Sequence, residues 1–448
     1  MKTAQILIAL AATVLCGNSL HAQWDPNSGD WGESDPRDLR VMTWNVGDSL
    51  TSTAFKTDTF GSWNGLVRII ASLQPDVLIL QECGDNSGNG TGSGADSVSE
   101  LEQTVELFFH GGPDPFRGGT VGSYVQLFTP SYDLPYVFVS GATDGFNRNV
   151  IVSRYPFTDL TGDGAVTINN FVLIPDAYQF GGNGGIRGQQ WAEIDLPDDE
   201  YAGDVAVGNS HLKAGGSSSD ENDRNRASRN IAYFIDHYFN GAGTGTSDPN
   251  GAVLVPTTGT LLGENTPVIW GGDLNDQPFG AFHPAERMTA AGVIGGSDGT
   301  DRDRSDAAFD SAFHPVTFDS STQSSSKLDY ICWQDSIAST RRSFVFRSSG
   351  SNMSVAKIPE PARSFPVSPL SISSISSDHR PVVVDFILPE AENCVGDLDG
   401  DGTIGFADLN AFTAAFQSGD SAGDLDGDGS VGFADLNLFT AAFQAGCP

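Results

Sequence analysis

The sequence predicts an α/β fold in which packed β-sheets are flanked by helices, followed by a small α-helical module. Three observations support this prediction. Short apolar segments of strand-like composition recur from Leu39 to Leu388 and outnumber the helical segments. These strands follow one another with few helical crossovers, which is typical of sheets that pack together and carry helices outside. After Pro389 the composition changes abruptly, and a repeat rich in aspartate and glycine begins.

The N-terminus has the features of a signal peptide. Lys2 precedes an apolar run from Ile6 to Val14. The segment Leu20-His21-Ala22 ends in a small residue, so we expect the signal peptide to be cleaved after Ala22. A buried first helix or a membrane anchor is the alternative, but the run is short and no later segment reaches membrane-spanning length. We therefore expect an exported protein, secreted, surface-associated or periplasmic, whose 448 residues form two or three units.

The chain is strongly acidic, with 57 acidic and 23 basic residues and a formal net charge of -34. Such a chain lacks the basic face that holds a nucleic acid by releasing counterions. The charge does not exclude an enzyme that meets phosphates through divalent cations, because a cation inverts the local charge. A saline habitat or plain solubility would also explain the acidity.

The predicted strands share one property, which is that most end in polar residues. In chain order they cover residues 39–46, 76–82, 149–154, 190–196, 204–211, 267–275, 327–333 and 381–388. In the sixth strand, Trp270-Gly271-Gly272-Asp273-Leu274-Asn275 places a carboxylate and an amide two residues apart. Residues i and i+2 of a strand share a face, so these two side chains converge. A strand running into an Asx turn is the alternative explanation.

Three helices are predicted between the strands. Residues 63–73 have apolar residues at helical spacing, and Pro75 stops that helix. Ser97 and Glu100 form a capping box ahead of residues 101–109. Residues 220–239 form a longer amphipathic helix.

Polar residues recur in order at the ends of the core strands. Any one of them alone has an ordinary structural explanation, but sites on sheets collect side chains at strand ends. The set comprises Asn45, Gln81, Glu82, Asn209, His211, Asp273, Asn275, Asp329, Asp378 and His379. The recurrence predicts one polar site at the sheet edge.

These motifs resemble the endonuclease/exonuclease/phosphatase superfamily, in its chain order. The resemblance rests on Asn45, Gln81-Glu82, Ser153-Arg154-Tyr155-Pro156, Asn209-Ser210-His211-Leu212, Gly272-Asp273-Leu274-Asn275, Leu328-Asp329-Tyr330 and Ser377-Asp378-His379. It spans about residues 39 to 388. It implies a four-layer sandwich of two packed, mainly antiparallel or mixed sheets flanked by helices, with metal-assisted phosphoester hydrolysis.

The resemblance also implies residue roles. Glu82 would ligate a magnesium or manganese ion, with Asp378 and with Asn45 nearby. Asp273 would orient or deprotonate the attacking water, and Asn275 would hold the phosphate or the aspartate. His379 would pair with Asp329 at the phosphate, and His211, with Asn209 beside it, would protonate the leaving group or bond a phosphate oxygen.

Two further features bear on the site. Gly47 stands where some family members carry an acidic residue, so we expect one catalytic cation. Lys213, Arg224, Arg226 and Arg229 could meet a phosphate chain, or could be a solvated helix face paired with nearby carboxylates.

The C-terminal repeat has the pattern of two calcium loops. Asp397-Leu398-Asp399-Gly400-Asp401-Gly402 recurs as Asp424-Leu425-Asp426-Gly427-Asp428-Gly429. Hard oxygen ligands at such spacings wrap one cation, and each loop is followed by one helix. The expected ligands are Asp397, Asp399, Asp401, Thr403 and Asp408 in the first loop, and Asp424, Asp426, Asp428, Ser430 and Asp435 in the second.

The doubled loop-helix unit resembles a dockerin, a module that docks on cohesin partners. The resemblance covers residues 394–447 and implies a cohesin-like or cell-surface partner, whereas the alternative is a calcium-stabilised tail. Phe406-Ala407 and Phe433-Ala434 depart from the small hydroxyl residues of many dockerins. Export makes a disulfide between Cys394 and Cys447 plausible, while Cys83 and Cys332 could be bridged or buried thiols.

The expected organisation is a signal peptide over residues 1–22, a catalytic domain over 23–389 and a calcium module over 390–448. The leading functional hypothesis is an exported, metal-dependent phosphodiesterase, namely a nuclease acting on extracellular DNA or RNA. A phosphatase or a sphingomyelinase-like phosphodiesterase is the alternative within enzymes. An inactive scaffold displayed through the calcium module is the alternative outside them.

Overall fold

The computed structural model describes the larger part of the chain. The described residues are 24–47, 50, 62–84, 97–114, 118–143, 147–162, 164–169, 189–239, 262–275, 307–335, 337–391, 395–399 and 403–446. The predicted signal peptide, Cys394, Cys447 and the expected calcium ligand Asp401 lie outside these residues.

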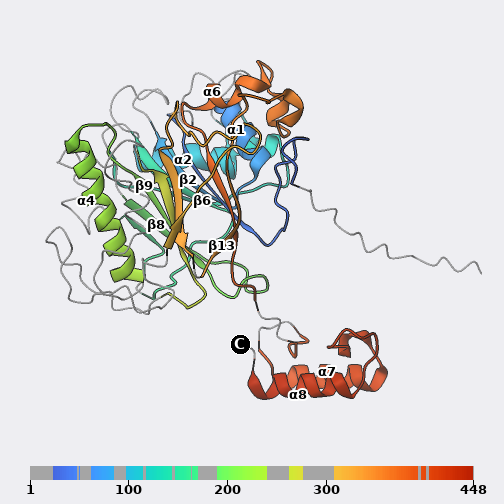
Figure 1. Ribbon diagram of the computed structural model, residues 1–448. Coiled ribbons are helices and arrows are strands. Elements are labelled where there is room, and N and C mark those ends of the chain that lie inside the picture. The colour runs from blue at the N-terminus through green and yellow to red at the C-terminus, as the bar shows by residue number, and fades with distance from the viewer. Residues whose placement is uncertain are drawn as a thin grey trace, which may run out of the picture.

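Two six-stranded sheets form the body of the molecule (Figure 1). The first has the order β13 (Ser339–Val345), β14 (Val382–Ile387), β1 (Leu39–Asn45), β2 (Val77–Cys83), β6 (Arg148–Ser153) and β5 (Tyr136–Val139). The second has the order β11 (Ala307–Phe309), β12 (Asp329–Gln334), β10 (Val268–Asp273), β9 (Val205–His211), β8 (Gln189–Ile194) and β7 (Thr167–Asn169). A small ribbon pairs β3 (Gly112–Pro113) with β4 (Thr120–Val121).

The two sheets repeat one pairing scheme. Each has a central parallel pair, β1 with β2 and β9 with β10, and its other neighbouring strands are antiparallel. The carboxyl ends of a parallel pair lie at the same edge of a sheet, so both central pairs deliver their last residues to one edge each. The sheets are therefore mixed, as the sequence predicts.

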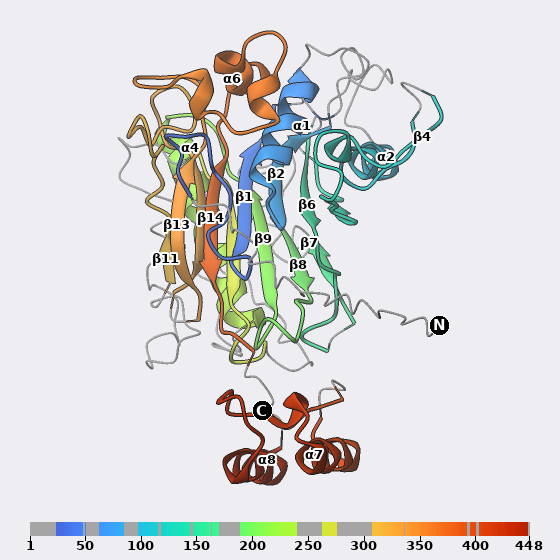
Figure 2. The ribbon, with the colours of Figure 1, turned by 90° about the vertical axis from the view of Figure 1, so that its right-hand side faces the viewer.

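Helices cover the outer faces of the sheets (Figure 2). They are α1 (Ser62–Leu73), α2 (Val98–Phe109), α4 (Ser218–Phe234), which continues as the π-helical turn η4 (Ile235–Phe239), and α6 (Ile372–Ser376). Short 3-10 turns are η2 (Val125–Leu127), η6 (Val355–Lys357), η7 (Ala362–Ser364) and η8 (Pro369–Ser371). The predicted capping box of α2 is confirmed, because Ser97 and Glu100 exchange hydrogen bonds. No helix in the described ranges is both long and apolar enough to cross a membrane.

Three apolar clusters correspond to the interfaces between four layers. One lies between the sheets and includes Val41, Ile79 and Ile269. A second joins the outer face of the first sheet to α1 and α2, and a third joins the second sheet to α4 through Trp270 and Phe234. The fold is thus an α/β sandwich, as predicted. Cys83 and Cys332 are both buried.

Strand alternation turns the polar strand ends toward the space between the sheets. Val41 of β1 and Ile269 of β10 belong to the inter-sheet core, whereas Met42 and Trp270 face the helices. Because successive side chains alternate, Asn45 and Asp273 continue the inward-facing series of their strands. The same parity applies to Asp329, two residues before the inward-facing Ile331.

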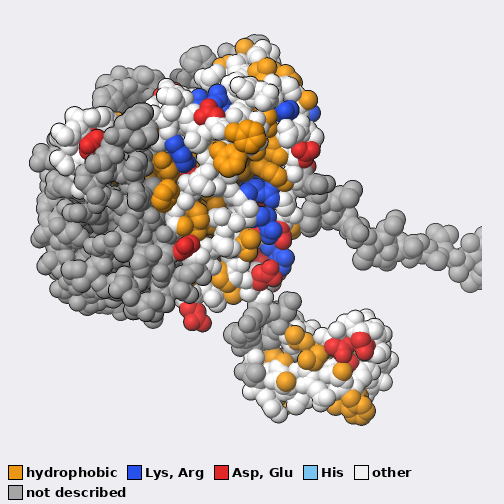
Figure 3. Space-filling model, viewed as in Figure 1, with side chains coloured by type: hydrophobic (Ala, Val, Ile, Leu, Met, Phe, Trp, Pro, Cys, Tyr) orange, Lys and Arg blue, Asp and Glu red, His pale blue; other side chains and the backbone are white. Residues whose placement is uncertain are grey.

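The C-terminal module holds two helices, α7 (Phe406–Ser418) and α8 (Phe433–Ala445), with the 3-10 turn η9 (Ser421–Gly423) between them. Phe412 and Phe439 stack with ring centroids 4.4 Å apart, and both are buried. Phe406 and Phe433 are 80% and 79% exposed, and Figure 3 shows hydrophobic side chains on the surface of this module. Two equivalent helices therefore share one small core and leave equivalent phenylalanines outside.

A turn between β6 and β7 shares a backbone hydrogen bond with the second C-terminal loop. Asp159 accepts hydrogen bonds from the backbone N–H groups of Gly162 and Gly164, as Asp424 accepts one from Gly429. Gly162 and Gly164 have φ values of 73° and 86°, close to the 70° and 88° of Gly427 and Gly429. Glu193 of β8 caps the turn by accepting from backbone N–H groups. This hydrogen-bond scheme is therefore not confined to the C-terminal repeats.

Candidate active site

The two sheets meet through Asn45 and Asp273. The side-chain N–H of Asn45, at the end of β1, donates to Oδ2 of Asp273, at the end of β10, over 3.0 Å. Nε2 of His211, at the end of β9, lies 3.3 Å from the same oxygen. Asn45, His211 and Asp273 are all almost fully buried. The parallel registers of the two central pairs thus place one carboxylate between residues of both sheets.

His379 and Asp329 form the predicted dyad. Nδ1 of His379 lies 2.9 Å from Oδ2 of Asp329, and Nε2 of His379 lies 3.8 Å from Oδ2 of Asp273. The indole N–H of Trp44 donates to the carbonyl of His379 over 3.1 Å, which fixes the backbone of the histidine. His379 therefore presents Nε2 toward Asp273 and Nδ1 toward its own buried carboxylate.

Electrostatics set the charge of the dyad. Burial alone would lower the pKa of His379, but the carboxylate of Asp329, assisted by Asp273 and Asp378, outweighs burial and raises that pKa to about 10. At neutral pH the imidazole is consequently a cation whose Nε2–H is a donor.

Asp273 is held in its ionised form. Burial would raise the pKa of its carboxyl, but the imidazoles of His211 and His379 and the hydrogen bond from Asn45 lower it well below its usual range. A carboxylate of such low basicity is ionised near pH 7, where it accepts hydrogen bonds but is a weak base.

Asn275 braces Asp273 through its backbone. Its N–H donates to Oδ1 of Asp273 over 2.9 Å, and its side-chain N–H donates to the carbonyl of Leu212 over 3.0 Å. The residue takes a left-handed conformation with φ of 49°, which asparagine tolerates better than most residues. The contact with Asp273 is thus the Asx turn that is the alternative explanation of this strand end, and the role of the Asn275 side chain at the phosphate stays a prediction.

The glycines before Asp273 allow close approach of neighbouring backbone. Gly272 has φ of 140°, and a Cβ there would meet the carbonyl oxygen of Ser210 at 1.8 Å. A Cβ on Gly271 would meet the carbonyl oxygen of Tyr330 at 2.6 Å. Both positions therefore exclude a side chain, and β10 can sit tightly between β9 and β12.

Glu82 has an unusual backbone and faces His211. Its φ is 55°, next to an irregularity in the pairing of β2 with β6 between Leu80 and Cys83. Its Oε1 lies 3.8 Å from Nε2 of His211, and its side chain is 25% exposed. Glu82, His211 and Asp273 each offer one ligand atom within 4.8 Å of the others. Two carboxylates, one of them partly exposed, are donors that suit magnesium or manganese.

Asp378 lies apart from that group. It is exposed, and its Oδ2 accepts a hydrogen bond from the side chain of Gln323 over 2.9 Å. The backbone N–H of Gly47 donates to Oδ1 of Asn45, so the position that is acidic in some family members here supports the asparagine. Asp378 is therefore next to the dyad, but it is not in the cluster around Glu82.

The side chain of Asn209 makes hydrogen bonds to neighbouring strands. Its side-chain N–H groups donate to the carbonyls of Leu80 and Val150 over 2.8 and 3.0 Å, and to Gln190 over 3.2 Å. Its Oδ1 accepts from Gln81 over 2.9 Å. This predicted site residue thus ties β9 to the first sheet beneath His211.

Sequence reasoning missed two residues of the site. Ser377 Oγ donates to the carbonyl of Asn45 over 2.7 Å and accepts the N–H of His379 over 3.1 Å. Gln323 places its side-chain nitrogen 2.9 Å from Nε2 of His379. Ser377 adjoins Asp378 and His379 in the sequence, which was a usable signal, whereas Gln323 lies in a serine-rich loop that carries none.

A family model described as "Endonuclease/Exonuclease/phosphatase family" matches residues 42–379. The chain belongs to the endonuclease/exonuclease/phosphatase family. No curated protein matches it. Phosphoester hydrolysis is the chemistry of this family, so the family membership and the buried Asp-His constellation agree.

Solved structures of the family resemble this chain only distantly. One is an endonuclease/exonuclease/phosphatase from Beutenbergia cavernae, with 19% identity, a TM-score of 0.39, and coverage of 79% of this chain and 72% of the other. Another is an endonuclease/exonuclease/phosphatase from Bacteroides vulgatus, with 13% identity, a TM-score of 0.42, and coverage of 78% and 99%. Sphingomyelinase C from Streptomyces griseocarneus has 18% identity, a TM-score of 0.38, and coverage of 78% and 99%.

Of the basic residues between β9 and the end of α4, the structure describes the side chains of Lys213 and Arg224. Arg224 is buried, and one of its nitrogens donates to the carbonyls of Lys213 and Gly215, each over 2.7 Å. Lys213 pairs with Asp220 at 3.7 Å. The side chains of Arg226 and Arg229 lie outside the description. Arg224 therefore braces the loop that follows His211.

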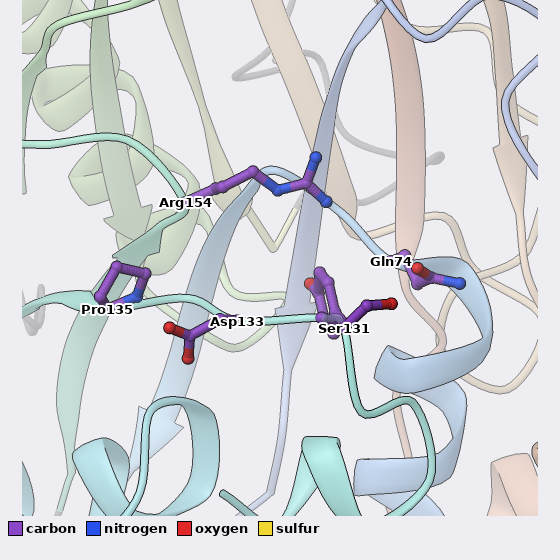
Figure 4. Close-up of a pocket in the computed structure, with 6 residues that line it drawn as sticks. Gln74, Ser131, Asp133, Pro135 and Arg154 are labelled. Atoms are coloured by element: carbon purple, nitrogen blue, oxygen red, sulfur yellow. The ribbon is translucent and has the colours of Figure 1, made fainter. Parts of the chain in front are cut away.

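A hollow lies at the opposite edge of the first sheet (Figure 4). It is lined by Gln74, Ser131, Tyr132, Asp133, Pro135 and Arg154. Arg154 follows Ser153, which pairs with Val77 at the start of β2, whereas Glu82 lies at the other end of that strand. The Arg154 guanidinium is 2.8 Å from the carboxylate of Asp76. This hollow is therefore remote from the Asp273 site.

The C-terminal loops each gather three carboxylates. Asp397, Asp399 and Asp408 form one group, and Asp424, Asp426 and Asp435 form the other. Of the remaining expected ligands in the described part, Thr403 and Ser430 lie in the loops, and Asp428 accepts the hydroxyl of Ser430 over 2.7 Å. These donor sets fit a hard cation.

Proposed function

We propose that the chain is an exported, divalent-cation-dependent phosphodiesterase that hydrolyses extracellular DNA or RNA. One observation carries the proposal: the buried carboxylate of Asp273 is bonded by Asn45 and faces the Nε2 atoms of both His211 and His379. A carboxylate flanked by two imidazoles supplies the acceptor and the donors that attack on a phosphoester needs.

Each side chain has a role in that reaction. Asp273 accepts a hydrogen bond from the attacking water and aims it, since its low pKa keeps it ionised and makes it a weak base. His379, kept cationic by Asp329, donates from Nε2 to a phosphoryl oxygen. His211 bonds a phosphate oxygen or gives a proton to the leaving oxygen.

A magnesium or manganese ion would be held by Glu82, with Asp378 and Asn45 as its further neighbours. The ion supplies positive charge against the phosphoryl oxygens. The partial exposure of Glu82 leaves room for the waters that magnesium retains. Gly47, which offers no carboxylate, favours one catalytic cation over two.

The remaining parts of the proposal concern the chain as a whole. Residues 1–22 would direct export, residues 23–389 would catalyse, and residues 390–448 would bind two calcium ions. The calcium module would attach the enzyme to a cohesin-like or cell-surface partner. The exposed Phe406 and Phe433 support an attachment role, because each lies beside a second phenylalanine ring and contiguous exposed apolar surface marks interaction sites.

A substrate panel tests the proposal. The full mature chain is incubated with supercoiled DNA, RNA, a nucleotide monophosphate and sphingomyelin, each with magnesium, with manganese or with a chelator. We expect cation-dependent cleavage of a nucleic acid. Release from the monophosphate or the lipid alone would move the assignment to a phosphatase or a lipid phosphodiesterase, and no release from any of the four would favour a scaffold.

A further inference from the structure

Asp378 and His379 are consecutive residues with opposite environments. The side chain of His379 is 4% exposed and belongs to the dyad, whereas Asp378 is exposed. The chain bends at Asp378, and His379 forms an isolated bridge with Gln323. The group that holds the carboxylate of Asp378 beside the imidazole comes from that second segment.

The side chain of Gln323 supplies that group. Its Nε2 donates to Oδ2 of Asp378 over 2.9 Å and lies 2.9 Å from Nε2 of His379. Within the part of the chain that the structure describes, no other side chain donates to the Asp378 carboxylate. One amide thus spans the two residues that the sequence places next to each other.

The loop that carries Gln323 is tightly held. Thr322 and Gln323 both donate their backbone N–H to the carbonyl of Ser326, and Ser326 donates back to Gln323. The hydroxyl of Thr322 accepts the N–H groups of Leu328 and Asp329, at 2.8 and 3.2 Å. The loop is thereby anchored to the start of β12, which carries the dyad carboxylate.

Arg380 attaches the same loop to the other side of the site. Its backbone N–H donates to the carbonyl of Thr322, and its guanidinium donates to the carbonyl and hydroxyl of Ser321. Since Arg380 directly follows His379, the loop is fixed relative to both members of the dyad. A side chain on such a support can hold another group in place with little loss of rotamer freedom.

We propose that Gln323 is a positioning residue that orients the carboxylate of Asp378 for the catalytic cation. The inference rests on the proposed function, because it assigns Asp378 to the cation. Partners of a ligating group orient it, and their loss commonly weakens cation binding about 10- to 100-fold.

Binding of manganese to the protein without substrate tests this inference. Electron paramagnetic resonance of the full mature chain, with calcium supplied for the C-terminal loops, measures bound manganese, and Glu82→Gln identifies the signal of the catalytic site. Gln323→Met keeps the length of the side chain and removes the amide. We expect it to weaken manganese binding about 10-fold or more, with an unchanged unfolding midpoint. The same substitution at Gln126 of η2, remote from the site, is the matched control and should change neither.

A double-mutant cycle makes the test specific. In an Asp378→Ala background, Gln323→Met should have little further effect on manganese binding, because the group it positions is gone. Equal manganese affinity of Gln323→Met and the wild type would overturn the inference while leaving the proposed function standing. Additive effects in the cycle would overturn it as well. If Glu82→Gln leaves every manganese signal unchanged, the cation site itself is wrong, and with it the proposed function.

Discussion

At the scale of single residues, the site depends on charges buried in pairs. Asp329 is fully buried beside Nδ1 of His379, and Asp273 is almost fully buried between two imidazoles. A buried charge is costly unless it is paired and hydrogen-bonded, so each member of the constellation sets the ionisation of its neighbours. Substitutions of these residues should change the pH dependence of activity before they change the fold.

Asp329→Asn should make activity fall at alkaline pH. Without the carboxylate, the pKa of His379 drops from about 10 toward the ordinary value of 6.5. The donor form is then lost as pH rises through the lowered pKa of His379. Two pH units above that pKa, the protonated fraction of His379 is about 100-fold smaller than at low pH. Profiles of kcat/KM against pH measure this effect. Parallel profiles for the variant and the wild type would show that His379 does not act as a cation.

His314 should make stability fall at acid pH. It is fully buried, its Nδ1 accepts two backbone N–H groups, and its Nε2 faces the carbonyl of Arg347. Burial is the main cause that lowers its pKa from 6.5 to about 4. Between these values the unfolded chain takes up a proton and the folded chain does not. The contribution of His314 to the free energy of unfolding is therefore complete above pH 6.5. As pH falls toward 4, about 3 kcal/mol of this contribution is lost.

Urea unfolding at several pH values checks this prediction. The free energy of unfolding of the wild type should fall more steeply between pH 6.5 and 4 than that of His314→Gln, which has no titrating group. Equal slopes for the two proteins would mean that His314 is not held neutral by the fold.

At the scale of elements, the amides of Gln81 and Asn209 join the two sheets under the site. Asn209 on β9 donates to carbonyls of β2 and β6, and it accepts from Gln81 on β2. These bonds cross between the sheets, so they favour one alignment of β2 against β9. The alignment matters because Glu82 and His211 extend from these two strands.

Asn209→Ala should destabilise the domain. It would leave several buried polar groups unsatisfied, at about 1–3 kcal/mol each, so a total of about 3 kcal/mol or more is expected. Urea unfolding measures the loss, with the exposed Asn27→Ala as the control for the same chemical change. A loss below about 0.5 kcal/mol, the usual range of a surface substitution, would return Asn209 to the candidates for a direct role at the phosphate.

The sequence predicted strand ends better than loops. The recurrence of polar residues at strand ends predicted that Asn45, Asp273 and Asp329 belong to one site, and the structure brings the first two into contact. Alternation could not show that Asn209 is saturated by backbone carbonyls, because those come from strands that are distant in the chain. It also could not find Gln323, whose position depends on the folding of a loop against Arg380.

At the scale of the whole molecule, two groups of candidate metal ligands with different chemistry occur in one chain. The catalytic donors mix carboxylates with imidazoles, whereas the C-terminal groups contain aspartates alone. Imidazole is a softer ligand than carboxylate, so calcium should prefer the C-terminal loops. The repeat was recognisable from sequence because its ligands are contiguous, whereas the catalytic donors come from strands far apart in the chain.

Calcium should stabilise the C-terminal module and leave the catalytic domain unchanged. Calorimetric scans of the full chain should show an unfolding transition that depends on calcium. The C-terminal module should be stabilised by about 2.7 kcal/mol when free calcium is 100 times the dissociation constant. Asp408→Ala with Asp435→Ala should remove the dependence, because each carboxylate belongs to one acidic group. Identical scans with calcium and with a chelator would leave these loops as acidic turns without an ion.

A comparison of Asp273→Asn with Asp133→Asn tests most directly whether Asp273 acts at the reacting phosphate. The change is the same in both, but Asp133 lies at the hollow on the opposite edge of the first sheet. With magnesium and the nucleic acid cleaved by the wild type, kcat/KM should fall about 10²- to 10⁴-fold for Asp273→Asn and should not change for Asp133→Asn. A folded Asp273→Asn variant with wild-type activity would contradict the assignment of Asp273 to the reacting phosphate.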